Sequence, residues 1–395
     1  MGLTDISREA LSKKAIELSK AHKNLLLEFA TGTGKTKASL DIINAHGGNW
    51  LIVVAERAHL KNWTDDIAKH NYNHLLPSIK FVLYASLKKE LGNMYYGIVL
   101  DEAHNCKSEV RRKALKSVLF NQAILLTATI SPSEKRLLEL TIGTIHTFKV
   151  SLTDAIDANI LPVPKIHLHE LLLDDVTADQ KFTMVKGTPS MRVSVNCTYA
   201  NRFIILTQYK HVNLTVTCTA LQKYNYLCEL VEYYKATYMR SRQMGVYNRW
   251  LQTASVRKRF IADIKTTAVK AFITTLPPSS RFICFTGSIN QCTALGGKSI
   301  VHSKIKDPQA IIDKFNDRKT NRLFAVGMLR EGVNLVDSDA IIVQLDSKSR
   351  STIQRTGRAL RKQFPVIHIF YYKNTIDEVY LNNSIEEFDK FVVRS

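Results

Sequence analysis

The sequence lacks the features that define several protein classes. Its six cysteines include no C-x-x-C pair, which argues against a zinc cluster or a disulfide framework and predicts buried free thiols. Sixteen glycines and nine prolines in 395 residues are too few for a collagenous or low-complexity chain. No apolar run approaches the ~18 residues of a membrane span, and no basic and apolar leader opens the chain. We therefore expect a globular, intracellular (cytoplasmic) protein with no membrane partner.

Acidic residues are scarce relative to basic ones. The chain has 55 Lys and Arg residues against 35 Asp and Glu residues, a net charge of +20. A surplus of this size is typical of proteins that hold a polyanion. Nucleic acid is therefore the first expected partner, ahead of an anionic membrane surface. At about 150 residues per domain, the length predicts two or three domains.

A glycine-rich turn follows the first apolar run. Residues 30–36, ATGTGKT, precede a helical stretch over 37–44, the order strand, phosphate loop, helix. In such a loop backbone N–H groups crowd around a phosphate, Lys35 can reach the terminal phosphates, and the Thr36 hydroxyl can bind Mg²⁺. The general pattern has glycine where Phe29 stands. The residues expected to hold the nucleotide here are Thr31, Gly32, Thr33, Gly34, Lys35 and Thr36.

A second apolar run, residues 96–100, ends in Asp101 and Glu102. Ligands of parallel sheets sit at the carboxyl ends of the strands. Asp101 is therefore predicted to hold Mg²⁺ through water, and Glu102 to polarise the attacking water. Three further apolar runs are typical of buried strands of the same sheet: 50–55, 79–84 and 122–129.

The second half of the chain repeats the α/β pattern. Its strand-like runs are 281–288, 322–327 and 340–345. After them, Arg355, Arg358 and Arg361 recur at a spacing of three, which on a helix places them roughly along one face. Guanidinium groups gathered in this way can converge on phosphates.

The segment 151–280 is longer than an interdomain linker requires, and residues 221–275 are predicted to form a helical insertion. Nine basic residues between Lys235 and Lys270 stand against one acid, Asp263, and aromatic residues are interleaved with them. Such a mixture can pair with phosphates and stack on bases. The alternative is an amphipathic helix pair with its aromatic residues packed inward and its charges in solvent. The predicted nucleic-acid contacts in this insertion are Arg240, Arg242, Arg249, Lys258 and Arg259.

Five motifs appear in the order found in superfamily 2 helicases and translocases, and the chain resembles that family over nearly its whole length. They are ATGTGKT at 30–36, DEAH at 101–104, TAT at 127–129, GMLREGVNL at 327–335 and QRTGRALR at 354–361. The resemblance implies an α/β fold of two RecA-like parallel-sheet domains in tandem, residues 1–150 and 151–395, with the helical insertion in the second. ATP then lies in the cleft between the domains.

The resemblance also implies roles for single residues. Arg358 and Arg361 would reach across the cleft as arginine fingers, and Gly332 and Asn334 would lie near the ribose and the interdomain contact. The residues that would couple hydrolysis to nucleic acid are His104, Thr127, Thr129 and Gln354. Those that would contact nucleic acid outside the insertion are Arg57, Lys61, Thr286 and Ser288.

Together these features predict an ATP- and Mg²⁺-dependent enzyme that is stimulated by nucleic acid. The Thr-Ala-Thr motif, in place of the Ser-Ala-Thr common among RNA helicases, favours a DNA helicase or translocase related to the repair, restriction and remodelling branch. An RNA helicase or RNA-remodelling ATPase is one alternative. An ATP-switched clamp on nucleic acid or protein, with slow hydrolysis, is the other.

The sequence leaves two points open. No glutamine precedes Gln122, so the glutamine that often reads adenine in this family is missing, and Arg8 or the backbone is the candidate substitute. A monomer is sufficient, because both domains of the cleft lie within one chain. A protein partner could supply specificity.

Overall fold

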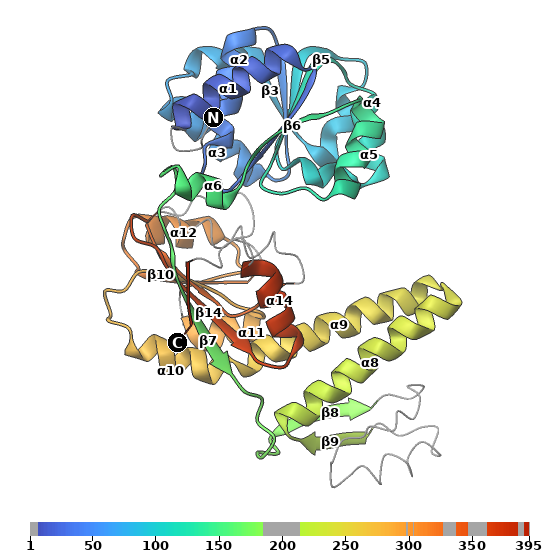
Figure 1. Ribbon diagram of the computed structural model, residues 1–395, viewed down its shortest axis with the longest axis vertical. Coiled ribbons are helices and arrows are strands. Elements are labelled where there is room, and N and C mark those ends of the chain that lie inside the picture. The colour runs from blue at the N-terminus through green and yellow to red at the C-terminus, as the bar shows by residue number, and fades with distance from the viewer. Residues whose placement is uncertain are drawn as a thin grey trace.

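The computed structural model describes residues 7–184, 214–297, 299–302, 304–326, 337–346, 362–385 and 391–394. These residues form two parallel sheets with flanking helices and one two-stranded antiparallel sheet (Figure 1). Cys197 lies outside the described residues, as do six residues of the last two motifs: Gly332, Asn334, Gln354, Arg355, Arg358 and Arg361.

The first sheet has six parallel strands in the order β3-β2-β4-β5-β1-β6. They are β1 (Asn24–Phe29), β2 (Trp50–Val54), β3 (Ile79–Leu83), β4 (Met94–Leu100), β5 (Leu119–Thr127) and β6 (His146–Val150). Every residue of β2 is buried, as expected of a strand covered on both faces. Trp50 packs so closely on Gly97 that a Cβ there would lie 2.3 Å from its ring, so only glycine fits.

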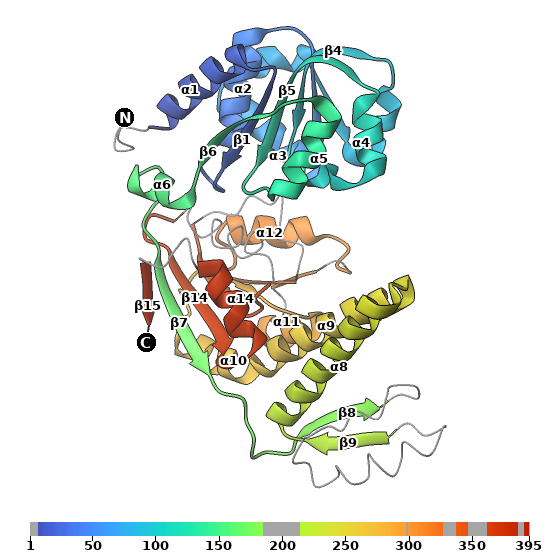
Figure 2. The same cartoon turned by 45° about the vertical axis from the view of Figure 1, so that its right-hand side comes forward.

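Helices cover both faces of this sheet (Figures 1 and 2). They are α1 (Arg8–Ala21), α2 (Lys35–His46), α3 (Arg57–Lys69), α4 (Glu109–Lys116) and α5 (Pro132–Ile142), with short 3₁₀ turns η2 (Asn73–Ser78), η3 (Tyr84–Glu90) and η4 (Ala103–Lys107). We call the part from α1 to β6 domain 1. Short α6 (Leu152–Asp157) follows, and residues 158–164 lead to the second sheet.

The second sheet has seven parallel strands in the order β11-β12-β10-β13-β14-β7-β15. They are β7 (Lys165–Leu171), β10 (Phe282–Phe285), β11 (Ile300–Val301), β12 (Arg322–Ala325), β13 (Asp339–Ile342), β14 (Val366–Tyr372) and β15 (Val392–Arg394). Its helices are α10 (Thr266–Thr275), α11 (Ile289–Gly296), α12 (Pro308–Asn316) and α14 (Ile376–Ile385). We call the part from β7 to β15 domain 2. Two tandem parallel sheets confirm the predicted fold class, while the exact division at residue 150 stays a prediction.

A helical hairpin is inserted between β7 and β10. It consists of α8 (Ala220–Ser241) and α9 (Met244–Ile264) and projects from the side of domain 2 (Figures 1 and 2). The turn between the helices places Arg242 at a φ of +53°. The hairpin covers most of the predicted insertion 221–275, but the end of that segment, Thr266–Thr275, is α10, a helix of the second sheet. An antiparallel pair before them, β8 (Gln180–Met184) and β9 (Leu214–Cys218), was not predicted.

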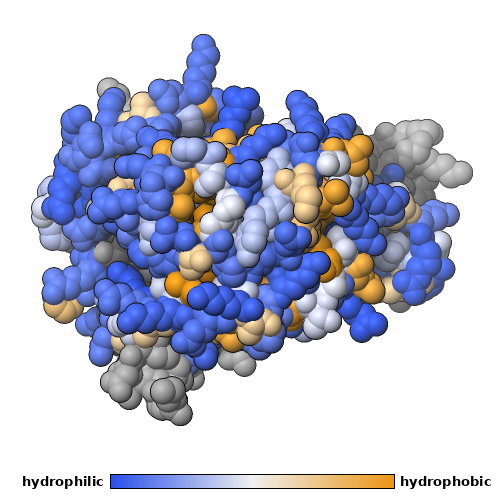
Figure 3. All heavy atoms as spheres, turned by 90° about the horizontal axis from the view of Figure 1, so that it is seen from above, coloured by the Kyte–Doolittle hydropathy of each residue, from blue (hydrophilic) through white to orange (hydrophobic). Residues whose placement is uncertain are grey.

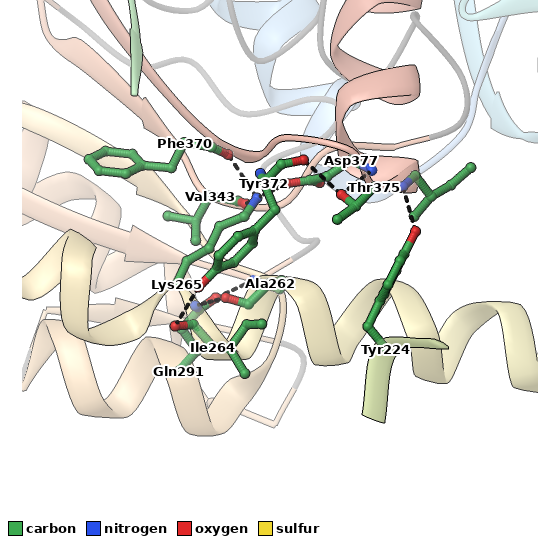
Figure 4. A network of polar contacts seen from close by, with 12 residues as sticks. Tyr224, Ala262, Ile264, Lys265, Gln291, Val343, Phe370, Tyr372, Thr375 and Asp377 are labelled. Carbon is green, nitrogen blue, oxygen red and sulfur yellow. Dashed lines mark hydrogen bonds and ion pairs between the residues drawn. The ribbon is translucent and has the colours of Figure 1, made fainter. Parts of the chain in front are cut away.

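A buried lysine fixes the base of the hairpin to domain 2. Lys265, between α9 and α10, is fully buried, and its Nζ donates to the carbonyls of Val343 (2.6 Å) and Phe370 (2.7 Å) and pairs with Asp377 (Figure 4). The Ile376 N–H donates to the Tyr224 hydroxyl at 2.7 Å. Burial lowers the pKa of Lys265 and raises that of Asp377, while their mutual attraction opposes both shifts. The hairpin base is therefore part of the domain 2 body.

The surface and the cysteines agree with the composition. The end of the molecule seen in Figure 3 is mostly hydrophilic, with small scattered hydrophobic patches. Among the described helices, none combines the length and the apolar character needed to cross a bilayer. The five described cysteines are free and four of them are buried. These four agree with the prediction of buried free thiols. Burial raises the pKa of the Cys106 thiol to about 11.

Candidate active site

The phosphate loop joins β1 to α2 in a conformation that depends on two glycines. Gly32 and Gly34 have φ values of +90° and +101°, a region that other residues seldom adopt. The Thr33 hydroxyl is buried and donates to the Ala30 carbonyl at 2.7 Å, which closes the loop. A loop of this kind before a helix N-terminus is a ready anion site.

Lys35 lies back over this loop. Its Nζ donates to the Phe29 carbonyl at 2.8 Å and to the Ala30 carbonyl at 3.4 Å. Thr36 is half-buried and lines the same cavity as Lys35. The side chains of Lys35 and Thr36, which are predicted to contact phosphate and Mg²⁺, therefore lie at the N-terminal end of α2.

Asp101 directly follows β4 and is held from several sides. Its N–H donates to the Val53 carbonyl at 2.9 Å, which continues the ladder with β2. Its Oδ2 accepts from Trp63 Nε1 at 3.0 Å and lies 3.3 Å from His59 Nδ1. The Tyr84 hydroxyl donates to its carbonyl at 3.0 Å, and burial holds the pKa of that hydroxyl well above its ordinary value, so it stays a donor.

Sequence reasoning missed His59 and Trp63. The signal was present in the spacing, because His59, Trp63 and Ile67 recur every four residues and so share one face of α3. All three are buried. The spacing does not show that two side chains on this face contact the Asp101 carboxylate, in addition to the apolar core.

Glu102 and the predicted coupling residues of domain 1 form one chain of contacts. Glu102 has a φ of +50°, which is uncommon for a residue with a side chain. His104 Nδ1 lies 3.4 Å from Glu102 Oε2 and 3.3 Å from Thr127 Oγ1. The Thr127 hydroxyl in turn donates to the Thr129 carbonyl at 2.8 Å. Because β5 lies between β4 and β1, this chain runs from the acidic pair to the strand beside the phosphate loop.

The phosphate loop, Asp101 and Glu102 face one cavity of about 810 Å³, whereas His104, Thr127 and Thr129 lie behind its wall and do not line it. Domain 1 supplies most of its wall, including Lys35, Thr36, Asp101 and Glu102. Lys362 and Gln363 of domain 2 line the same cavity. They are the first described residues after the predicted arginine pair. The cavity is therefore bounded by both halves of the chain, as a nucleotide site between two domains requires.

The segment between the domains packs on the phosphate loop. Arg8 Nη2 donates to the carbonyls of Gly32 (3.4 Å) and Ile160 (3.2 Å). A Cβ at Gly32 would lie 3.2 Å from Leu161 Cδ2. Arg8, the candidate reader of the base, is thus bonded to two backbone carbonyls at the cavity wall.

The donor set of the cavity suits Mg²⁺ held with a nucleotide. Such sites use one or two carboxylates together with phosphate oxygens and water, and Asp101 and Thr36 supply one carboxylate and one hydroxyl. In the described part of the chain, no cluster of three or more His, Cys, Asp or Glu side chains could hold a metal by itself. Asp101 and Thr36 therefore fit a Mg²⁺ ion that nucleotide phosphates would also ligate.

The predicted nucleic-acid contacts fall into two groups. Arg57 and Lys61 are exposed on α3. Thr286, in contrast, is buried and donates to the Ala325 carbonyl at 3.1 Å. Ser288 caps α11 and donates to Asp263 Oδ1 at 2.5 Å. Both hydroxyls are thus hydrogen-bonded within domain 2, at the turn from β10 to α11. Their contact with nucleic acid stays a prediction.

The distal half of the hairpin, residues 232–259, contains no fully buried residue. Tyr238, Tyr247 and Trp250 pack on one another there, with ring centroids 5.0 to 6.1 Å apart. This packing matches the alternative interpretation of the aromatic residues. Four of the five predicted basic contacts are exposed: Arg240, Arg242, Arg249 and Arg259.

Lys258 differs from the other predicted contacts of the hairpin. It pairs with Asp346 of domain 2 at 2.7 Å, and Lys265 is the buried anchor described above. The nine basic residues of the insertion therefore do not form a single basic surface. Exposed basic residues near the hairpin tip are Arg240, Arg242 and Arg249.

Two family models match the chain. Residues 1–132 match a model described as type III restriction enzyme, res subunit, and residues 265–363 match one described as helicase conserved C-terminal domain. Together they span more than half of the chain. No curated protein matches the sequence.

Solved helicase structures share the fold. The Hef helicase domain of Pyrococcus furiosus is 15% identical, with 95% of this chain and 97% of that chain covered and a TM-score of 0.50. S. cerevisiae Dbp5 bound to RNA and ADP BeF3 is 13% identical, with 97% and 88% covered and a TM-score of 0.59.

The matches to the two family models indicate an ATP-hydrolysing motor that depends on nucleic acid, and the two parallel-sheet domains agree with them. Within that class, the chain belongs to the superfamily 2 helicases.

Proposed function

We propose that the protein is a DNA-stimulated ATPase that translocates along DNA or separates its strands. The observation that carries this proposal is the contact chain from Glu102 through His104 to Thr127, since it joins the hydrolytic carboxylate to a motif that meets nucleic acid in related motors. The choice of DNA is supported by Thr127-Ala128-Thr129 and by the restriction-enzyme description of the model matching residues 1–132.

In this proposal the residues of domain 1 carry out the chemistry. Lys35 exchanges two neutral carbonyls for the terminal phosphates, a charge-assisted contact that is stronger. Thr36 and Asp101 hold Mg²⁺, which neutralises charge on the phosphates when it is bound. Glu102 orients the attacking water and accepts its proton.

We propose that domain 2 completes the site. Arg358 and Arg361 act as arginine fingers, while Gly332 and Asn334 lie near the ribose. Lys362 in the cavity wall supports this proposal. Because these charges come from a second domain, hydrolysis depends on the closing of the two domains, as a motor needs.

We propose two contact regions for nucleic acid. The first is Arg57 and Lys61 on domain 1, with Gln354 as a coupling residue on domain 2. The second is the exposed tip of the hairpin, which carries Arg240, Arg242 and Arg249 together with the aromatic cluster of Tyr238, Tyr247 and Trp250; the Arg242 guanidinium lies 5.7 Å from the centre of the Tyr238 ring. Phosphate pairing by such arginines releases counterions, so binding to this tip should weaken with salt.

The test is the rate of ATP hydrolysis with no polymer, single-stranded DNA, duplex DNA and RNA. We expect stimulation by DNA that exceeds stimulation by RNA. Stronger stimulation by RNA would identify an RNA-remodelling ATPase instead. Slow hydrolysis that no polymer changes, together with ATP-dependent retention of DNA, would identify a clamp. Lys35→Ala serves as the control for contaminating ATPases.

A further inference from the structure

Helix α3 carries two different sets of side chains on alternating positions. Arg57 and Lys61 are exposed, whereas His59 and Trp63 are only 4% and 2% exposed. The two buried side chains point to the same atom, Oδ2 of Asp101, at 3.3 and 3.0 Å. Ile67, one turn further along, is fully buried and anchors this face of the helix.

We propose that Trp63 and His59 are positioning residues for Asp101, and that α3 transmits a nucleic-acid contact at Arg57 and Lys61 to that carboxylate. The second part rests on the proposed function, because it takes Arg57 and Lys61 as nucleic-acid contacts. The first part does not, since it concerns only the geometry of Asp101.

The physical basis is that a carboxylate ligand is held in one orientation by hydrogen bonds from side chains that do not themselves touch the metal. The Asp101 backbone is held by Val53 and Tyr84, but its carboxylate can still turn about two side-chain bonds. Two nitrogens on one oxygen select a single orientation and leave the other oxygen for the metal and its water. Outer partners of this kind typically change metal affinity about 10- to 100-fold when they are removed.

A buried indole N–H needs a hydrogen-bond acceptor, but that acceptor need not be a carboxylate. Trp50, the other fully buried tryptophan of domain 1, donates instead to a backbone carbonyl, that of Gly47, at 2.8 Å. A tryptophan that serves only the core needs no more than such a carbonyl. Trp63 instead directs its N–H to the one carboxylate predicted to meet the metal, on a helix whose other face is basic.

The first experiment compares Trp63→Phe with Trp50→Phe. Both changes remove an indole N–H and the same ring volume from the core of domain 1. We measure binding of a fluorescent ATP analogue while Mg²⁺ is titrated, without DNA. For Trp63→Phe we expect the Mg²⁺ midpoint to rise about tenfold, with Mg²⁺-free analogue binding unchanged. For Trp50→Phe we expect the wild-type midpoint. Equal midpoints in the two variants would overturn the positioning role.

His59 provides a rescue test of the same role. Asn at this position keeps a polar nitrogen near the place of Nδ1, whereas Ala does not. We expect His59→Ala to raise the Mg²⁺ midpoint and His59→Asn to restore most of the wild-type value. If His59→Asn shifts the midpoint as far as His59→Ala does, the hydrogen bond to Asp101 is not the cause.

The transmission along α3 is tested with DNA. In the wild-type protein, saturating DNA should lower the Mg²⁺ midpoint, and Lys61→Ala should remove that effect. Lys61→Ala added to Trp63→Phe should change nothing further. A midpoint in the wild type that does not respond to DNA, although DNA stimulates hydrolysis, would overturn the transmission alone. Absence of any DNA stimulation would instead contradict the proposed function, while the Trp63→Phe result without DNA would still decide the positioning role.

Discussion

His104 Nδ1 lies 3.4 Å from Oε2 of Glu102, two residues before it in the chain. The same ring nitrogen lies 3.3 Å from the Thr127 hydroxyl at the end of β5. One imidazole therefore stands between the carboxylate expected to act on water and the neighbouring strand. This arrangement is the basis for our proposal that His104 couples Thr127 and Thr129 to Glu102.

Replacing His104 should uncouple the motor. In His104→Ala we expect the ratio of DNA-stimulated to basal ATP hydrolysis to fall about tenfold, a size common for residues on a coupling path. The measurement is steady-state hydrolysis with and without saturating single-stranded DNA. An unchanged ratio in a folded His104→Ala protein would show that this histidine does not couple the two sites.

Variants of Glu102 and Lys35 should differ in whether they lose ATP binding as well as ATP hydrolysis. Glu102→Gln should lower turnover by about 100-fold or more, because a general base is lost, while ATP still binds. Lys35→Ala should lose both nucleotide binding and turnover, because the cation beside the phosphates is removed. Equilibrium binding of labelled ATP and steady-state hydrolysis distinguish the two. Substantial turnover in either variant would refute the assignment of the site.

The exposed hairpin tip should contribute to DNA affinity. Reversing Arg240, Arg242 and Arg249 to Glu should weaken DNA binding and make it less sensitive to salt. The slope of log affinity against log salt concentration should become shallower by about 0.7–0.9 for each DNA phosphate that the variant no longer neutralises. Fluorescence anisotropy at several salt concentrations measures both the affinity and the slope.

A matched control reverses three exposed lysines in and just after α1, Lys13, Lys20 and Lys23. It has the same change in net charge. Lys258 is left in place because its reversal would break the pair with Asp346. If the tip variant binds DNA as tightly as the α1 variant does, the aromatic cluster merely packs the hairpin.

Breaking the buried pair of Lys265 and Asp377 should destabilise the protein more than removing both charges. Lys265→Met leaves the Asp377 carboxylate buried without its cation, a change expected to lower the unfolding free energy by about 3–5 kcal/mol. The double variant Lys265→Met with Asp377→Asn should recover much of that loss, because no buried charge remains. Urea unfolding followed by circular dichroism gives both values. A double variant no more stable than Lys265→Met would contradict the pairing.

Three neighbouring histidines should make domain 2 sensitive to acid. Burial, together with repulsion from His169 and His167, lowers the pKa of His368 to about 3, and His169 Nε2 lies 3.0 Å from its Nδ1. In the unfolded chain His368 has a pKa near 6.5 and becomes protonated below that pH, whereas in the folded protein it stays neutral. The free energy of unfolding therefore falls as pH falls below about 6.5. The slope for one such group is at most about 1.4 kcal/mol per pH unit.

The matching variant is His368→Asn, whose amide stands near the place of Nδ1 and does not titrate. Between pH 7 and 5, above the range in which most carboxylates titrate, we expect its unfolding free energy to fall less steeply than that of the wild type. Urea unfolding at each pH provides the comparison. Parallel slopes would show that His368 is not responsible.

Much of the fold could be predicted because its strands are local. β1, β2, β4 and β5 are apolar runs that need no partner to be recognised, since strands buried on both faces contain few polar residues. The strands not recognised are β6, β7, β8, β9, β11, β14 and β15. Several of them have mixed sequences, such as HTFKV of β6, that become strands only through their neighbours. The order of strands in each sheet could not be predicted either, because it depends on contacts between segments far apart in the sequence.

The sequence by itself located the residues that are proposed to hold the nucleotide. Lys35, Thr36, Asp101 and Glu102 belong to short contiguous motifs, in which a loop or a strand end brings the residue to the edge of the sheet. Only the tertiary structure decided the partners: Trp63 on Asp101, Lys258 on Asp346, Lys265 on Asp377, and Thr286 turned inward. The reason is that a side chain's partner across tens of residues depends on packing, and packing is a property of the whole fold rather than of any segment.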